Sequence, residues 1–82
     1  MRARIYCYKP ENAIRGKIVV IDEEDNKVSF QFVSQFSLRL ALRLILNTYR
    51  DIEIIISPAC SQKVVDLVAE VLKEYGREIV VK

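Results

Sequence analysis

Residues 51–57 constrain the fold of this chain more than any other segment. Ile52, Ile54, Ile55 and Ile56 make the segment almost continuously apolar, without the strict alternation of a strand that faces water on one side. Such a run is typical of a central parallel strand that is covered on both faces. Because parallel strands need crossover connections, usually helices, the segment predicts a sheet whose later strands alternate with helices.

The first part of the chain is predicted to be a meander of three strands. Residues 2–8 alternate Arg or Tyr with small or apolar side chains, a period of two that indicates a strand. A turn follows over residues 9–16, which include Pro10, Asn12 and Gly16. Residues 17–21 and 27–33 are β-branched and aromatic, and the polar residues 22–26 between them favour a hairpin.

The hairpin also predicts which side chains share a face of the sheet. Pairing of Ile21 with Val28 and of Val19 with Phe30 would bury these four residues together with Phe32. The opposite face would then expose three apolar residues beside the Arg and Tyr side chains of the first strand: Ile18, Val20 and Ile55. Monomers rarely leave so large an apolar patch uncovered, so we expect a partner or a second copy to pack there.

Two segments have the periodicity of helices. The first is capped by Ser34 or Ser37 and runs to about Tyr49. Its polar stripe is narrow and consists of Arg39, Arg43, Asn47 and Arg50. Leucines occupy most of the remaining circumference, so we expect the flank of this helix to contact a neighbouring helix or another subunit.

The second helix is predicted over residues 61–75, and Gly76 is expected to close it at the C′ position. Residues 77–82 then form a last strand, which a right-handed crossover would place parallel to the strand of residues 51–57. No repeat or linker divides the chain. Residues 1–82 are therefore predicted to form a single α+β domain, a five-stranded mixed sheet with two helices in the order β-β-β-α-β-α-β.

This element order resembles that of the ribonuclease H-like family. The segment SLRLALRLILNTYRDIEIIIS resembles the family's first helix and fourth strand, and RIYCYKP followed by GKIVVIDEEDNKVSFQFVS resembles its opening meander. Members of the family use carboxylates that hold two metal ions. At the corresponding places this chain has Tyr8 and Lys9, Arg39, and Ser57 and Pro58. The resemblance therefore implies a ribonuclease H-like fold and argues against the family's catalytic activity.

The composition excludes further chemistries. The chain has no histidine and two cysteines far apart, Cys7 and Cys60, so it cannot build the usual zinc sites or His-dependent nucleophiles. We predict no metal and no cofactor. No apolar run approaches the roughly 20 residues that span a membrane, and no secretion leader is evident. We therefore expect a cytoplasmic protein, in which a disulfide is disfavoured. The preference for Ile, Val, Lys, Glu and Arg is typical of thermophilic proteins.

Two groups of residues are candidates for binding nucleic acid. The net charge is only +2, so any such affinity has to come from a local patch. Arg39, Arg43 and Arg50 suit bidentate contacts to phosphate, and they equally suit the solvated edge of a helix that is otherwise buried. The second group combines cationic and aromatic side chains on one strand face, as single-strand-binding surfaces do, and consists of Arg2, Arg4, Tyr6 and Tyr8.

A third candidate is the segment of residues 57–62, where a strand ends and a helix begins. Ligands of open α/β sheets prefer this location. The hydroxyls of Ser57 and Ser61 and the backbone N–H groups are candidates to hold an anion, with Cys60 as a partly ionised thiol. The alternative interpretation is a serine cap beside a small buried cysteine.

The acidic residues 22–25 are interpreted as a solvated hairpin loop, because they lack the glycine and spacing of a calcium-binding loop. A metal-dependent nuclease would need Asp22, Glu23, Asp51 or Glu53 to converge.

The sequence thus favours a small non-catalytic interaction module that forms a homodimer, with nucleic acid as a further candidate partner. The alternative is a small-ligand or anion-binding protein, or an enzyme, that uses residues 57–62 with Cys60.

Overall fold

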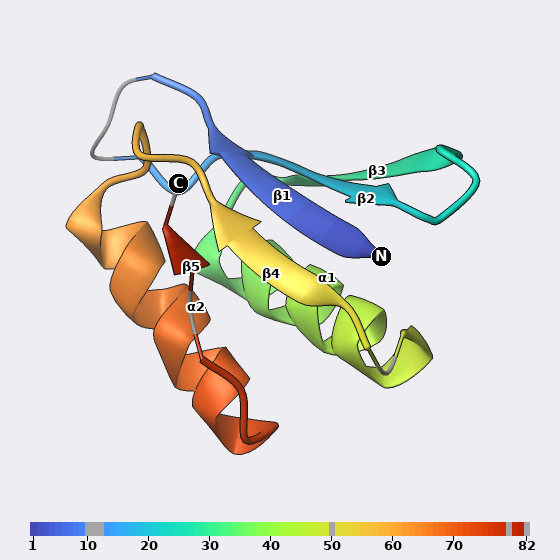
Figure 1. Cartoon of the computed structure of the whole chain (residues 1–82). Coiled ribbons are helices and arrows are strands. Elements are labelled where there is room, and N and C mark those ends of the chain that lie inside the picture. Colours follow the sequence, from blue (N-terminus) through green and yellow to red (C-terminus); the bar gives the residue numbers. More distant parts are fainter. Residues whose placement is uncertain (10–12, 50, 79, 82) are drawn as a thin grey trace.

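The computed structural model describes residues 1–9, 13–49, 51–78 and 80–81, and it consists of a mixed sheet with two helices (Figure 1). The three strands of the meander are β1 (Arg2–Cys7), β2 (Gly16–Ile21) and β3 (Lys27–Phe32), followed by α1 (Gln35–Thr48), β4 (Glu53–Ile56) and α2 (Gln62–Glu74). Strand β1 pairs antiparallel with β2 and parallel with β4, and β2 pairs antiparallel with β3. The α+β class and the mixed sheet agree with the expectation from the sequence.

The prediction of five strands is wrong. The sheet has four strands of four to six residues, in the order β3-β2-β1-β4. Of the predicted last strand, residues 79 and 82 lie outside the described residues, and among the described ones Val80–Val81 form the short β5 at the edge beside β4. The reason lies at the end of α2. Gly76 adopts a left-handed conformation (φ 66°), and the Arg77 N–H turns back to donate to the Leu72 carbonyl at 2.9 Å. This Gly-based C-cap was expected, but it uses residues that the sequence analysis assigned to the strand.

Both helices cover the same face of the sheet, as Figure 1 shows. The core lies between the two helices and this face of the sheet, and it is entirely apolar among the described residues. The sheet contributes Ala3, Ile5, Ile18, Val20, Phe32, Ile54 and Ile56, and the helices contribute Leu38, Leu42, Ile45, Val64, Val68, Val71 and Leu72, among others. The opposite face of the sheet, called the open face below, is not covered by either helix.

The predicted pairing of the hairpin is shifted by one residue. Val28 pairs with Val20 instead of Ile21, and Phe30 pairs with Ile18 instead of Val19. A shift of one residue exchanges the two faces of a strand. Ile18 and Val20, which were expected on the open face, are therefore buried in the core.

The hairpin loop accounts for this register. The Asp22 carboxylate accepts hydrogen bonds from the backbone N–H groups of Glu24 and Asn26, both at 2.9 Å, and from the Asn26 side chain at 3.1 Å. Asp25 takes a positive φ of 62° within the same turn. The loop thereby closes over residues 22–26, and the pair Ile21 and Lys27 directly precedes it.

The apolar patch expected on the open face does not form. Ile55 does lie on that face, beside Arg4, but only 2% of it is exposed. Val19 and Ile21, which replace Ile18 and Val20 there, are half-buried. The open face is therefore mainly polar and basic.

Helix α1 begins at the serine pair that the sequence singled out. Ser34 is the N-cap, and its hydroxyl accepts the Ser37 N–H at 3.2 Å, while the Ser37 hydroxyl accepts the Ser34 N–H at 3.0 Å. This reciprocal capping box satisfies two N–H groups that a helix start otherwise leaves without partners. The helix ends at Tyr49, its C-cap, as predicted.

Gly16 allows β2 to start close to its neighbours. A Cβ atom at this position would lie 2.8 Å from Cζ of Phe32 and would also overlap the Tyr6 carbonyl oxygen. Only glycine therefore fits between β1 and the end of β3.

Candidate functional site

The arginines of α1 face α2 and are engaged by its acids. The Arg39 guanidinium lies 3.3 Å from the Glu70 carboxylate, and Arg43 lies 3.3 Å from Glu74. Both pairs repeat at a spacing of four residues on each helix, so two helical turns are matched across the interface. Arg50, the third member of this group, lies outside the described residues. These acidic partners could not be predicted from the spacing along α1, because they come from the other helix.

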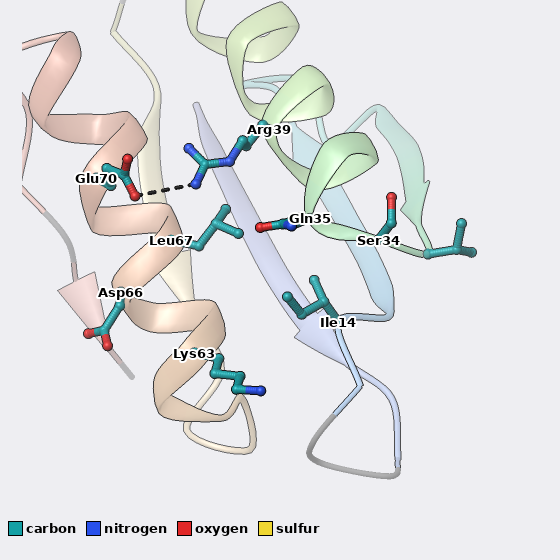
Figure 2. Close-up of a pocket in the computed structure, with 9 residues that line it drawn as sticks. Ile14, Ser34, Gln35, Arg39, Lys63, Asp66, Leu67 and Glu70 are labelled. Atoms are coloured by element: carbon teal, nitrogen blue, oxygen red, sulfur yellow. Dashed lines mark hydrogen bonds and ion pairs between the residues drawn. The ribbon is translucent and has the colours of Figure 1, made fainter.

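A groove between the two helices contains one of these ion pairs (Figure 2). Its volume is about 570 Å³, and it is lined by Ile14, Val33, Ser34, Gln35, Arg39, Lys63, Asp66, Leu67 and Glu70. Ile14, Val33 and Leu67 are apolar, and the four charged residues balance one another. Glu70 is engaged by Arg39, and Asp66 accepts a hydrogen bond from the Gln62 side chain at 2.7 Å. The groove therefore has no excess charge to select an anion or a cation.

A row of apolar side chains is exposed on the side of α1 away from the core. Phe36, Leu40 and Leu44 follow at intervals of four residues and are 73%, 67% and 55% exposed. We call these three residues the α1 row. Val33, which precedes the N-cap Ser34, is also 72% exposed. The flank of α1 was expected to contact a neighbouring helix or another subunit. It does contact α2, through Arg39 and Arg43, and the α1 row is the apolar part of the helix that neither α2 nor the sheet covers.

The second predicted nucleic-acid-binding group lies on the open face, together with two lysines that were not predicted. The predicted residues are Arg2, Arg4, Tyr6 and Tyr8, and the lysines are Lys17 and Lys27. Tyr6 pairs with Lys17, and the Lys17 ammonium lies 5.6 Å from the centre of the Tyr6 ring. A hollow of about 490 Å³ is lined by Tyr6, Cys7, Tyr8, Lys17, Val19, Ile21, Lys27 and Ser29. Arg2 and Arg4 lie further along β1 on the same face, opposite Ile21 and Val19. Lys17 and Lys27 were missed because only the strand register brings them beside β1.

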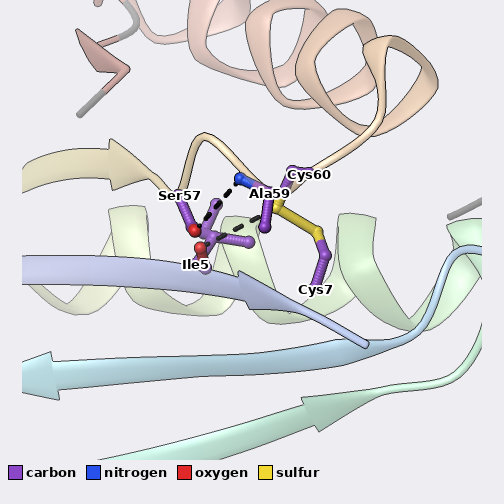
Figure 3. Close-up of a disulfide and its surroundings, with 5 residues drawn as sticks. All are labelled: Ile5, Cys7, Ser57, Ala59 and Cys60. Atoms are coloured by element: carbon purple, nitrogen blue, oxygen red, sulfur yellow. Dashed lines mark hydrogen bonds between the residues drawn. A yellow bond between two sulfur atoms is a disulfide. The ribbon is translucent and has the colours of Figure 1, made fainter. Parts of the chain in front are cut away.

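The segment of residues 57–62 is closed by a disulfide (Figure 3). Cys60 is joined to Cys7 at the end of β1, with the two Cα atoms 5.1 Å apart. The expectation that a disulfide is disfavoured is therefore not met. The fold brings the end of β1 against the turn after β4, where the Ser57 N–H donates to the Ile5 carbonyl at 3.0 Å.

This disulfide changes what the segment can do chemically. Cys60 carries no thiolate while it is bonded to Cys7. The N–H groups of Ala59 and Cys60 donate to the hydroxyl and the carbonyl of Ser57, at 3.3 and 3.0 Å, so they are used within the turn. The Ser61 hydroxyl makes no cap hydrogen bond to α2, and its oxygen is buried without a partner among the described residues. The anion site at Ser57, Cys60 and Ser61 stays a prediction.

The acids of the hairpin loop lie near one end of the sheet. Asp22, Glu23, Asp25 and Glu53 line a hollow of about 340 Å³ together with Met1 and Arg2. The pKa of Asp22 is lowered, first by the hydrogen bond from the Asn26 N–H and further by those from the Asn26 side chain and the Glu24 N–H. Across the described part of the chain, no three acidic or cysteine side chains are placed to hold a metal ion together.

Neither α1 nor α2 is long and apolar enough to cross a membrane, as judged over the residues that the structure describes. The cytoplasmic location and the thermophilic origin remain expectations.

No protein-family model, no curated protein and no solved structure matches the chain. The resemblance to the ribonuclease H-like family therefore stays a prediction.

Proposed function

We propose that the protein is a non-catalytic interaction module that self-associates as a homodimer through the α1 row. The observation that carries the proposal is the exposure of Phe36, Leu40 and Leu44, each more than half accessible and aligned along one helix. Aligned apolar side chains of this size are typical of a surface that another molecule covers.

A second copy of the chain is the occupant that the charges favour. Arg39 and Arg43 directly precede Leu40 and Leu44 of the α1 row in the sequence. Because Glu74 and Glu70 neutralise these arginines within the chain, two copies can meet without repulsion between like charges. A two-fold interface would bring the same row together from both copies, so each apolar side chain would meet another apolar side chain.

The expected affinity of the dimer follows from the apolar side chains that it would bury. Burial of a large apolar side chain contributes on the order of 1.5–3 kcal/mol. Each copy contributes the three residues of the α1 row and Val33, so the interface would contain eight such side chains. Each of them is already partly buried in the monomer. After the cost of association, this leaves a dimer with a dissociation constant in roughly the micromolar range.

Several features support a non-catalytic role. The chain has no histidine, and both of its cysteines form the disulfide. The charged residues of the helix groove balance one another, as described above. Among the described residues, the hydrogen bonds of the serine and threonine hydroxyls go to backbone groups or to another serine, and none joins a hydroxyl to a carboxylate or a lysine.

Light scattering at increasing protein concentration tests the proposal. The wild-type mass should rise from 9.5 kDa toward twice that value. Leu40→Glu should remain a monomer, because it places a charge in the middle of the α1 row. Ala59→Glu adds the same charge at an exposed position in the turn after β4 and should dimerise like the wild type.

Circular dichroism of Leu40→Glu separates loss of the dimer from loss of the fold. Because Leu40 is 67% exposed, the helical signal should be retained. A wild-type protein that keeps the monomer mass at every concentration, or a Leu40→Glu variant that dimerises as well as the wild type, would contradict the proposal.

A further inference from the structure

The open face of the sheet combines positive charge with accessible aromatic rings. Both helices pack on the other face (Figure 1). The core cluster therefore contains the β1 and β2 residues that alternate with those of the open face, namely Ala3, Ile5, Ile18 and Val20. The register places Tyr6 beside Lys17, Arg4 beside Val19 and Arg2 beside Ile21. On the far side of β2, Lys27 lies beside Ile21.

The charge of this face is unbalanced. Four cations lie on it, namely Arg2, Arg4, Lys17 and Lys27. The described strands β1, β2 and β3 contain no acid. At the end nearest the acidic loop, Arg2 lines a hollow with Asp22, Glu23, Asp25 and Glu53, and Lys27 directly follows the loop. Arg4 and Lys17 lie further from these acids, beside Val19 and Tyr6. The arginines of α1 differ, because Glu70 and Glu74 neutralise two of them. The end of the face that carries Tyr6 and Lys17 is therefore the more strongly positive end.

Two tyrosines make this end suitable for stacking. Tyr6 and Tyr8 are 38% and 39% exposed, and both line the hollow of about 490 Å³ on this face. Val19 and Ile21 form an apolar part of its lining between Lys17 and Lys27. An unpaired base can stack on an accessible aromatic ring while neighbouring cations hold the phosphates. A base within a duplex cannot do so, because its faces are already stacked on its neighbours.

We infer that the open face binds single-stranded nucleic acid, with Tyr6 and Tyr8 as stacking platforms and Arg4, Lys17 and Lys27 as phosphate contacts. This site lies on the opposite side of the sheet from the helices and does not depend on the proposed dimer. It replaces the α1 arginines as the place where phosphate is held. The ligand is a strand of few nucleotides, since the hollow and its cations span three neighbouring strands.

Fluorescence anisotropy with three labelled probes tests the inference: a short oligothymidylate, the matching oligouridylate and a duplex of mixed sequence. The single strands should bind more tightly than the duplex, and affinity should fall steeply with salt. Tyr6→Leu should weaken binding of the single strands by about 5- to 150-fold, the effect of losing one stacked base. Tyr6→Phe keeps the ring and should bind like the wild type.

Two arginine variants form a matched pair. Arg4→Ala should reduce the slope of log affinity against log salt by about 0.7, the value for one phosphate contact of a single strand. Arg39→Ala removes the same charge from α1 and should leave the slope unchanged. The monomeric Leu40→Glu variant should bind as the wild type does, so failure of the dimer and failure of this site are distinguishable.

Four results would overturn the inference. These are the absence of binding at low salt, tighter binding of the duplex, unchanged affinity in Tyr6→Leu, and equal effects of Arg4→Ala and Arg39→Ala.

Discussion

Removal of the Cys7–Cys60 disulfide should strongly destabilise the protein. The bond joins residues that are 53 positions apart, so it closes a loop of most of the chain. In the chain-entropy description, such a loop removes about 14 cal/mol/K from the entropy of the unfolded chain, or about 4 kcal/mol near room temperature. The loss of native contacts adds little to this value, because both cysteines are only half-buried.

Thermal unfolding followed by circular dichroism measures this effect. A domain of this size has an unfolding entropy of about 2.1 cal/mol/K per residue, so a loss of about 4 kcal/mol lowers the melting temperature by about 20 °C. The wild type should show this drop when reductant is added, and Cys7→Ala/Cys60→Ala should show it without reductant. Protein concentration has to be held constant, because a dimer melts at a concentration-dependent temperature. A change in the free energy of unfolding below about 1 kcal/mol would contradict a stabilising role of this loop closure.

Three further predictions follow from individual contacts. Gly16→Ala should lower the free energy of unfolding, measured by urea denaturation, by at least about 2 kcal/mol, because the new Cβ would lie 2.8 Å from Phe32. A variant as stable as the wild type would contradict the close approach of the strands at this position. The pKa of the Asp22 carboxyl lies below its ordinary value of 3.8, so the stability it contributes is complete near neutral pH and is lost as the pH falls through the lowered pKa. Urea titrations from neutral to acidic pH should therefore show a smaller loss of stability for Asp22→Asn than for the wild type, and equal losses would argue against the hydrogen-bonded loop. A double-mutant cycle on Arg39 and Glu70 should give a coupling of only about 0.2–1 kcal/mol, because Glu70 is largely exposed; a value above about 2 kcal/mol would contradict this.

Local signals in the sequence predicted most of the secondary structure correctly. The apolar run at Ile54–Ile56 does form a parallel strand, the Ser34 cap does begin α1, and Gly76 does end α2. Each of these features depends on residues close together in the chain, where periodicity and capping chemistry are decisive.

Features that depend on pairing between distant residues were harder to predict. The hairpin register was wrong by one position, since the hydrogen bonds of Asp22 in the loop, rather than the apolar pattern alone, determine which residues pair. That single shift moved Ile18 and Val20 into the core, and with them the expected site of association. The fifth strand was overestimated because Arg77 takes part in the cap of α2.

The candidate surfaces, like the fold, were predicted only where they depend on residues close together in the chain. Arg2, Arg4, Tyr6 and Tyr8 were found from their alternation on one strand, whereas Lys17 and Lys27 join them only through the sheet. The α1 row follows from a spacing of four residues that is visible in the sequence. Its exposure could not be predicted, because it depends on where α2 and the sheet lie around α1.

Cross-linking at the centre of the α1 row tests the proposed dimer most directly. In a two-fold interface, the central residue lies near the symmetry axis and close to its counterpart in the other copy. Leu40→Cys would carry the sole free thiol, since Cys7 and Cys60 are bonded to each other. With a short bismaleimide, this variant should form a covalent dimer, whereas Ala59→Cys should remain monomeric. Equal cross-linking of the two variants, or none in either, would contradict association through α1.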